Sequence, residues 1–183
     1  MIGYIIAGAV VVLLILYVVA TYNSLVSLRN RVNDQWSQID VELKRRFDLI
    51  PNLVNTVKGY AKHEEETLER VIKARNTYLS SGTKEQAMEA DSELSSAINK
   101  LFALSESYPD LKANQNFLDL QAQLKDTEEK ISYARKFYND TALRLNNKID
   151  MFPSNLIAKI FKFVKVEFFK ANDAERVNVK VEF

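Results

Sequence analysis

The sequence contains no cysteine and one histidine, which excludes most metal and thiol chemistry. Without cysteine there is neither a disulfide nor a catalytic thiolate, and a zinc site would depend on carboxylates alone. The histidine lies in the stretch His63-Glu64-Glu65-Glu66-Thr67, which superficially resembles a zinc-protease helix. That motif needs a second histidine where Thr67 stands, so we predict no metal ion and no cofactor.

Glycine and proline are also scarce, with four and three residues respectively. Loops that bind phosphates or dinucleotides need clustered glycines, whereas only Gly59 and Gly82 follow Gly8. A serine nucleophile would have only His63 as an imidazole base, and no nucleophile elbow is visible. We therefore expect no catalytic residues and no small-molecule substrate. So few turn-forming residues favour long helices.

Charge is nearly balanced, at a formal +1, which argues against nucleic acid as a partner because phosphate binding needs a concentrated basic face.

Charged side chains are absent from the start of the chain, since the 25 basic and 24 acidic side chains all lie at Arg29 or beyond. The segment Met1–Tyr22 is apolar, and about 20 residues rising 1.5 Å each match a hydrocarbon core roughly 30 Å thick. We predict one transmembrane helix over 1–22, with membrane lipid as a partner.

Three tyrosines mark the expected membrane interfaces: Tyr4, Tyr17 and Tyr22. Tyr4 and Tyr22 would lie about 27 Å apart along a helix, which suits the two boundaries between lipid and water. A cleaved signal peptide is the alternative, but the segment lacks a basic n-region and its apolar run is longer than usual. Arg29 and Arg31 follow the segment, so the positive-inside rule places the N-terminus outside and the following domain in the cytoplasm.

A stripe of apolar and small residues continues from this segment. Its members recur every three or four positions, which is typical of a helix and not of a strand. The stripe comprises Leu28, Val32, Trp36, Ile39, Leu43, Phe47, Ile50, Val54, Val57 and Ala61. Pro51 has no N–H for the carbonyl of Phe47, yet the stripe keeps its phase across it. We predict a kink or a tight helix–helix junction at Pro51.

Turn signals divide the rest of the chain. The apolar spacing ends at Leu79, and the next three residues, 80–82, form a loop signal. Thr83 and Gln86 then have the spacing of a capping box at the start of a second helix. Pro109 and Pro153 are the further predicted helix junctions, and they bound a third long helix.

The predicted fold class is therefore all-α. A transmembrane helix, 1–22, continues into an antiparallel bundle of three long helices with a short C-terminal helix, 23–170. An extended tail, 171–183, follows. Its residues Arg176–Phe183 alternate as a strand would, but a frayed terminus fits this pattern equally well.

The segment Leu156–Lys170 combines apolar side chains with lysines. It could lie on an anionic membrane surface, and the residues that would then contact lipid are Lys159, Phe161, Lys162 and Lys165. Alternatively, its apolar residues cover the end of the bundle. We favour this alternative because many amphipathic helices simply face a core.

Several separate stretches resemble the LemA family of bacterial membrane proteins. They are the stretch Tyr22–Arg75, and the motifs YPDLKANQNFLDLQ from Tyr108, TEEKISYARKFYN from Thr127 and FPSNLIAKIFKF from Phe152. The resemblance implies a membrane-anchored bundle of long antiparallel helices in the cytoplasm, attached to the bacterial inner membrane, and it implies no enzymatic activity. It also implies helix-junction and interhelix roles for Arg46, Pro51, Asn52, His63, Glu128, Arg135, Tyr138 and Asn139.

Two hypotheses for the function follow. In the first, copies of the chain self-associate as a membrane scaffold, because a helix over 23–79 of about 85 Å would be too long for a returning helix of about 37 Å to cover. Small residues at Gly3, Ala7 and Gly8 would let spans of two copies pack closely. In the second, the bundle is an adaptor for another membrane protein, such as a protease or a signalling protein.

Overall fold

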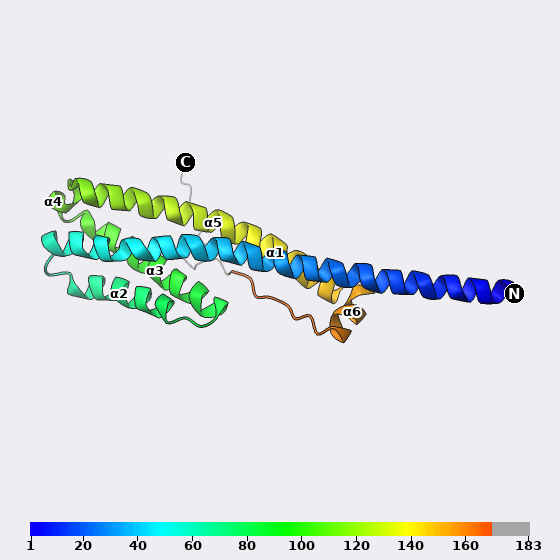
Figure 1. Ribbon diagram of the computed structural model, residues 1–183. Helices are drawn as coiled ribbons and strands as arrows, with labels where there is room; N and C mark the ends of the chain where they lie inside the picture. The colour runs from blue at the N-terminus through cyan, green and yellow to red at the C-terminus, as the bar shows by residue number, and fades with distance from the viewer. Residues whose placement is uncertain (170–183) are drawn as a thin grey trace, which may run out of the picture. The chain divides into compact units, whose positions relative to one another are not determined.

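The computed structural model describes residues 1–169, which form six helices and no strand (Figure 1). This confirms the all-α fold class. The helices are α1, Ile2–Tyr60; α2, Glu65–Leu79; α3, Lys84–Ser105; α4, Pro109–Lys112; α5, Gln115–Asp150; and α6, Ser154–Ile160. The tail predicted for 171–183, with its alternating stretch Arg176–Phe183, lies outside the described residues.

Helix α1 passes from the apolar segment into the charged part of the chain without interruption over its 59 residues. The predicted stripe forms its buried face, which confirms the helical interpretation of the spacing. Fully or nearly fully buried members of the stripe are Val32, Ile39, Leu43, Phe47, Ile50, Val54, Val57 and Ala61. Leu28 and Trp36 are partly buried.

Of the two alternatives predicted at Pro51, a kink or a tight helix–helix junction, the junction lies further along the chain. Helix α1 continues through Pro51 to Tyr60, and the chain turns over residues 61–64 before α2 begins. The proline is tolerated because another group, Nε of Arg75 in α2, donates a hydrogen bond to the Phe47 carbonyl that Pro51 leaves without an N–H. The helix junction is therefore the turn after Tyr60.

The cap predicted for the next helix is present. The hydroxyl of Thr83 accepts a hydrogen bond of 3.2 Å from the backbone N–H of Gln86, in the first turn of α3. The Gln86 side chain reaches back and accepts a bond of 2.9 Å from the N–H of Gly82. Both bonds satisfy donors that would otherwise be exposed at the start of the helix.

The described residues divide into two compact units. Unit 1 consists of Met1–Gln38 and Ala134–Phe168, and unit 2 consists of Ile39–Tyr133 together with Phe169. Helices α1 and α5 each contribute one part to both units.

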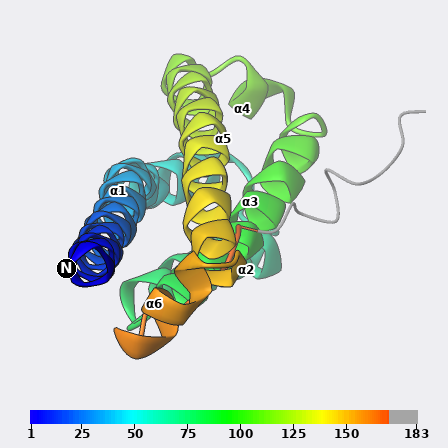
Figure 2. The same ribbon diagram turned by 90° about the vertical axis from the view of Figure 1, so that its right-hand side faces the viewer.

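Unit 2 is a bundle of long helices. The second part of α1 and helix α2 run antiparallel, since Phe47 stacks on Tyr78 with ring centroids 3.9 Å apart and Asp40 accepts a bond from the Tyr78 hydroxyl. Helix α4 bridges the ends of α3 and α5 (Figure 2). The core contains Leu43, Phe47, Ile50, Leu68, Val71, Leu94, Ile98, Leu101, Leu111, Phe117, Leu124 and Ile131.

Unit 1 pairs the first part of α1 with the end of α5, and Trp36 meets Tyr138 edge-on with ring centroids 6.0 Å apart. Helix α6 and the extended residues 163–168 complete the unit. This extended stretch is fixed to α5 by Asn146, whose amide donates to the Val166 carbonyl at 2.9 Å and accepts from the Val166 N–H at 3.0 Å. The Tyr138 hydroxyl donates to the carbonyl of Glu167 at 3.1 Å.

Candidate functional site

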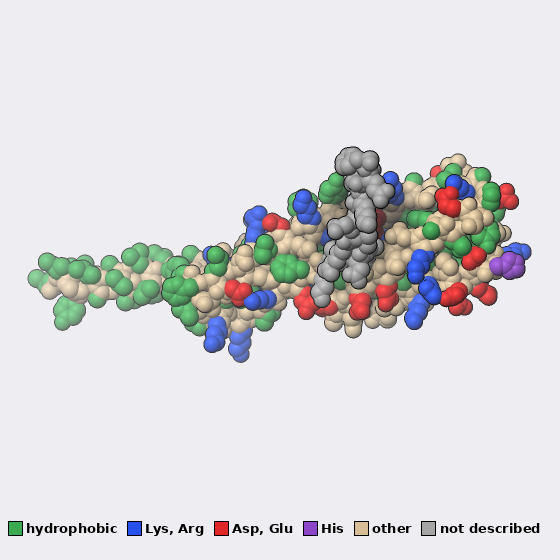
Figure 3. All heavy atoms as spheres, turned by 180° about the vertical axis from the view of Figure 1, so that it is seen from behind, with side chains coloured by type: hydrophobic (Ala, Val, Ile, Leu, Met, Phe, Trp, Pro, Cys, Tyr) green, Lys and Arg blue, Asp and Glu red, His purple; other side chains and the backbone are tan. Residues whose placement is uncertain are grey.

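The apolar start of α1 is long and apolar enough to cross a membrane. Its 18-residue window has a mean hydropathy of 2.8 and none of that window is buried against the rest of the chain. Hydrophobic side chains line this part of α1, while charged side chains appear only beyond it (Figure 3). Large apolar side chains exposed in such a row are unstable in water and stable in lipid. The segment therefore has the properties of a membrane anchor.

The three tyrosines assigned to the membrane interfaces lie at different places on this segment. Tyr4 is almost fully exposed near the N-terminal end, and Tyr17 is partly covered. Tyr22 contacts the chain that follows α6, with its ring centroid 4.7 Å from that of Phe161 and 5.9 Å from that of Phe163. The apolar segment thus ends where the packed part of unit 1 begins.

The predicted junction prolines occupy three different settings. Pro51 lies in the interior of α1, as described above, with an exposed side chain. Pro109 is the first residue of α4, where its missing N–H would have no helical partner in any case. Pro153 is the N-cap of α6 and follows a cis peptide bond.

The segment after Pro153 has apolar side chains on two sides. Ser154, Ile157 and Ala158 of α6 are buried, which agrees in part with a helix that covers the end of a bundle. Several large apolar side chains of the segment are exposed, namely Leu156, Ile160, Phe161, Val164 and Phe168. Phe163 and Val166 are partly buried, and Phe169 is buried. The lysines predicted to contact lipid, Lys159, Lys162 and Lys165, are exposed as well.

Helix α6 ends in a Schellman motif with an unusual residue at its turn. The N–H of Phe163 donates to the carbonyl of Ala158 at 2.9 Å, and the N–H of Lys162 donates to the carbonyl of Lys159 at 3.2 Å. Lys162 has φ of 56°, the left-handed conformation that glycine usually supplies at this position. A residue with a side chain in this conformation lowers the stability of the folded state by about 1 kcal/mol relative to glycine. The sequence reasoning did not identify this turn.

A buried ion pair connects three helices of unit 2. The Arg46 guanidinium on α1 lies 2.9 Å from a carboxylate oxygen of Asp91 on α3 and 2.6 Å from one of Glu128 on α5. It also donates to the Ser95 hydroxyl at 3.0 Å. Arg46 and Asp91 are 3% and 0% exposed, whereas Glu128 is 35% exposed. Burial lowers the pKa of Arg46, and the Glu128 carboxylate opposes this shift.

This network supports the interhelix role that the family resemblance implied for Arg46 and Glu128. Asp91 was missed, although its spacing from Ala87 and Leu94 places a carboxylate in an apolar helical register. A cavity of about 270 Å³ between α3 and α5 is lined by Arg46 and Glu128, among others. Among residues 1–169 no group of three His, Cys, Asp or Glu side chains could hold a metal ion, and His63 lies exposed in the turn after α1.

Together these features define a membrane-associated helical protein with an apolar N-terminal helix and a bundle held by a buried ion pair. Residues 35–183 match the model of the LemA family, and the chain belongs to that family.

Similar proteins carry two different names. The chain is 29% identical over 158 residues to Protein LemA of Metamycoplasma hominis, covering 86% of this chain and 72% of that protein. It is 24% identical over 179 residues to Magnetosome protein MamQ 1 of Paramagnetospirillum magneticum and to Magnetosome protein MamQ of Magnetospirillum gryphiswaldense, covering 84% of this chain and 66% of each of them.

Proposed function

We propose that the protein is a non-enzymatic scaffold, anchored in the bacterial inner membrane by one span and self-associating there. Its N-terminus lies outside and its helical bundle in the cytoplasm. The observation that carries the proposal is the continuity of α1 from Ile2 to Tyr60, with no linker between the apolar segment and the bundle. A continuous helix transmits the orientation of the span to the residues that follow it, which a scaffold needs and a loosely tethered enzyme does not. The LemA family is not known as an enzyme family.

Helix lengths alone predict that copies meet through the apolar stripe of α1, but the structure favours another surface. Most of the stripe on α1 is buried within the chain, so it offers little surface to a second copy. The span itself has none of its apolar window buried. On this helix Gly3 and Ala7 lie one turn apart, and a side chain added at Gly3 would meet nothing within 4 Å. We therefore assign the contact between copies to the face of the span that carries Gly3 and Ala7.

Crosslinking in native membranes, followed by sizing of the detergent-extracted protein, tests this proposal. We expect a ladder of self-multiples, which the substitutions Gly3→Leu and Ala7→Leu shorten because bulky side chains separate the helix backbones. The matched control is Val12→Leu, a large-to-large change in the same segment, which should leave the ladder intact. A strictly monomeric particle at micromolar concentration contradicts self-association.

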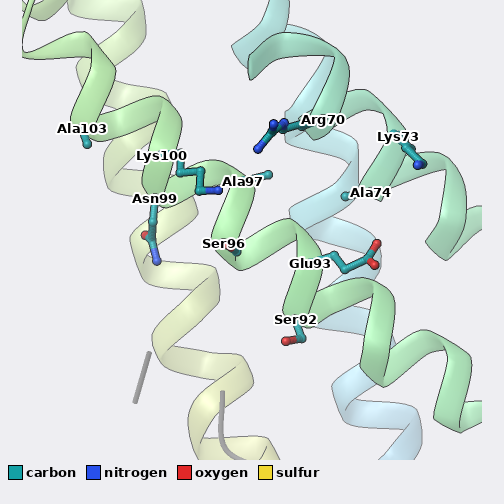
Figure 4. Close-up of a pocket in the computed structure, with 10 residues that line it drawn as sticks. All are labelled: Arg70, Lys73, Ala74, Ser92, Glu93, Ser96, Ala97, Asn99, Lys100 and Ala103. Carbon is teal, nitrogen blue, oxygen red and sulfur yellow. The ribbon is translucent and has the colours of Figure 1, made fainter. Parts of the chain in front are cut away.

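A second candidate function, an adaptor for another membrane protein, rests on a groove in unit 2. The groove, of about 740 Å³, lies between α2 and α3. Its floor is formed by small side chains, and Arg70 and Lys100 extend over it (Figure 4). Small residues let a partner helix approach closely. The lining cations, Arg70, Lys73 and Lys100, outnumber the one lining carboxylate, Glu93, which favours an acidic partner. One discrete heterologous crosslinked band, lost in an Ala97→Trp variant that fills the groove, supports the adaptor over the scaffold.

A further inference from the structure

Helix α6 has apolar side chains on the side that faces away from the rest of unit 1 as well as on the side that packs against it. Leu156 and Ile160 lie one helical turn apart and are 55% and 72% exposed, while Ile157 and Ala158 are buried. In a seven-residue helix this leaves only Asn155 and Lys159 as polar side chains of the outer surface. A helix with large apolar side chains on its outer as well as its inner side normally has both sides covered, by a core or by lipid.

The exposed apolar surface extends beyond the helix at both ends. Met151 and Phe152 precede it with exposed fractions of 63% and 79%, and Val164 follows it with 77%. We call the six exposed side chains the α6 patch: Met151, Phe152, Leu156, Ile160, Phe161 and Val164. Single exposed apolar residues are common, but a group of this size within fourteen consecutive positions marks a surface that is covered by something else.

Contacts with α1 fix where the patch lies relative to the apolar segment. Phe161 packs on Tyr22, the last residue of that segment, with ring centroids 4.7 Å apart. The Phe163 ring centroid lies 5.9 Å from that of Tyr22 and 5.3 Å from the guanidinium carbon of Arg29. Arg29 is the first charged residue of the chain. Part of the patch therefore lies beside the point where α1 passes from apolar to charged sequence, near the place of α6 along α1 in Figure 1. If the apolar segment spans a bilayer, this point falls at the lipid headgroups.

The charges around the patch are mainly positive. Lys159 lies on the exposed surface of α6, and Lys162 follows it in the left-handed turn that ends the helix. Lys165 is exposed and forms an ion pair of 2.7 Å with Asp150. Because Lys162 holds the left-handed conformation that glycine favours, a change to glycine there removes the charge without straining the turn.

We propose that the α6 patch docks on the anionic surface of the bilayer that holds the apolar segment of α1. The apolar side chains enter the acyl boundary, and Lys159 and Lys162 meet anionic headgroups. Because α1 already anchors the chain, the patch is held close to the bilayer at a high effective concentration. A patch of this size can then bind the surface, although a free helix of the same length would not. The membrane contact rests on the proposed anchor but not on self-association.

The absence of cysteine allows a direct test with single labels on the full-length protein. We would place an environment-sensitive fluorophore at Leu156→Cys or Ile160→Cys and reconstitute one copy per nanodisc of phosphatidylcholine with phosphatidylglycerol. Quenching by lipids that carry a nitroxide on the acyl chain should reach both labels. A label at Leu143→Cys, an exposed apolar position on α5, is the matched control and should remain unquenched.

The lysines give a second and independent measurement. Each lysine near an anionic surface contributes about 1 kcal/mol, so its removal should shift the ratio of docked to undocked patch about fivefold. Lys162→Gly removes the charge at a position where glycine suits the backbone, so loss of docking cannot then be attributed to misfolding. Lys162→Arg keeps the charge and should dock as the parent protein does.

Two outcomes overturn the proposal, and a control label separates failure of insertion from failure of docking. Quenching at Leu156 and Ile160 that is no greater than at Leu143 overturns the proposal. In parallel discs that hold two copies, shielding of the labels that appears only there and does not follow the lipid quencher also overturns it, because a second copy then covers the patch. A label at Val12→Cys reports on the anchor, so failure of insertion is distinguishable from failure of docking.

Discussion

The Nε atom of Arg75 donates a hydrogen bond of 3.3 Å to the main-chain carbonyl of Phe47. That carbonyl lies four residues before Pro51, which has no N–H to offer it. A side chain of α2 thus replaces the hydrogen bond that α1 loses at its proline. The bond also ties the two antiparallel helices together, next to the stacked rings of Phe47 and Tyr78.

The first prediction concerns the coupling between Arg75 and Pro51. Arg75→Ala should lower the free energy of unfolding by about 1.5 kcal/mol, because a partly buried carbonyl loses a charged donor. In a Pro51→Ala background the loss should be smaller by about 1 kcal/mol, since the alanine N–H bonds to the Phe47 carbonyl. Denaturant unfolding of the four proteins measures this difference, and strict additivity would show that the Arg75 hydrogen bond does not replace the one that Pro51 removes.

The path of α1 shows what the sequence could and could not predict. The spacing of apolar residues identified the buried face on both sides of Pro51, because that face depends only on local periodicity. The continuation of the helix through the proline depends on Arg75, which is 28 positions from Phe47 and has no recognisable pattern with it. The turn at 61–64 contains no glycine or proline, so the usual signals of a helix end were absent.

The segment around α6 shows a second limit of sequence reasoning. Its composition fits both a core-facing helix and a lipid-facing helix, because both need apolar residues beside lysines. Only the fold divides these side chains into a buried set and an exposed set. The attachment of residues 163–168 through Asn146 was likewise hidden, since the bonding partner Val166 is 20 positions away.

The second prediction concerns the buried ion pair of Arg46 and Asp91. Arg46→Met should destabilise the protein by about 3 to 5 kcal/mol, because it leaves the Asp91 carboxylate buried without its cation. Arg45→Met, at the exposed neighbouring position, should change stability by less than about 0.5 kcal/mol. The double variant Arg46→Met/Asp91→Leu should recover most of the loss, as measured by denaturant unfolding. A double variant as unstable as Arg46→Met alone contradicts this account.

The third prediction concerns alkaline pH and the Tyr78 hydroxyl. Burial and the hydrogen bond to Asp40 raise the pKa of Tyr78 above its ordinary value of 10.0. The folded state therefore favours the protonated phenol. The resulting contribution to the free energy of unfolding is complete below the pKa that Tyr78 has in the unfolded chain, and it is lost as the pH rises from there through the higher pKa of the folded state. Tyr78→Phe should be less stable than the parent protein at about pH 8, by about 1 kcal/mol for the lost hydrogen bond. Unfolding measured from about pH 8 to 11 should show this gap narrowing only above about pH 10, and a gap independent of pH contradicts the prediction.

The fourth prediction concerns the attachment of residues 163–168, which carry the C-terminal side of the α6 patch. Asn146→Ala removes both hydrogen bonds to Val166, so the local opening free energy should fall by about 2 kcal/mol. Hydrogen exchange of the Val166 amide should accordingly become about thirtyfold faster. Asn146→Asp keeps the acceptor and loses the donor, and it should give an intermediate rate. Asn147→Ala, at the exposed neighbouring position, should leave the exchange unchanged. Equal rates in Asn146→Ala and the parent protein would show that other contacts hold the segment in place.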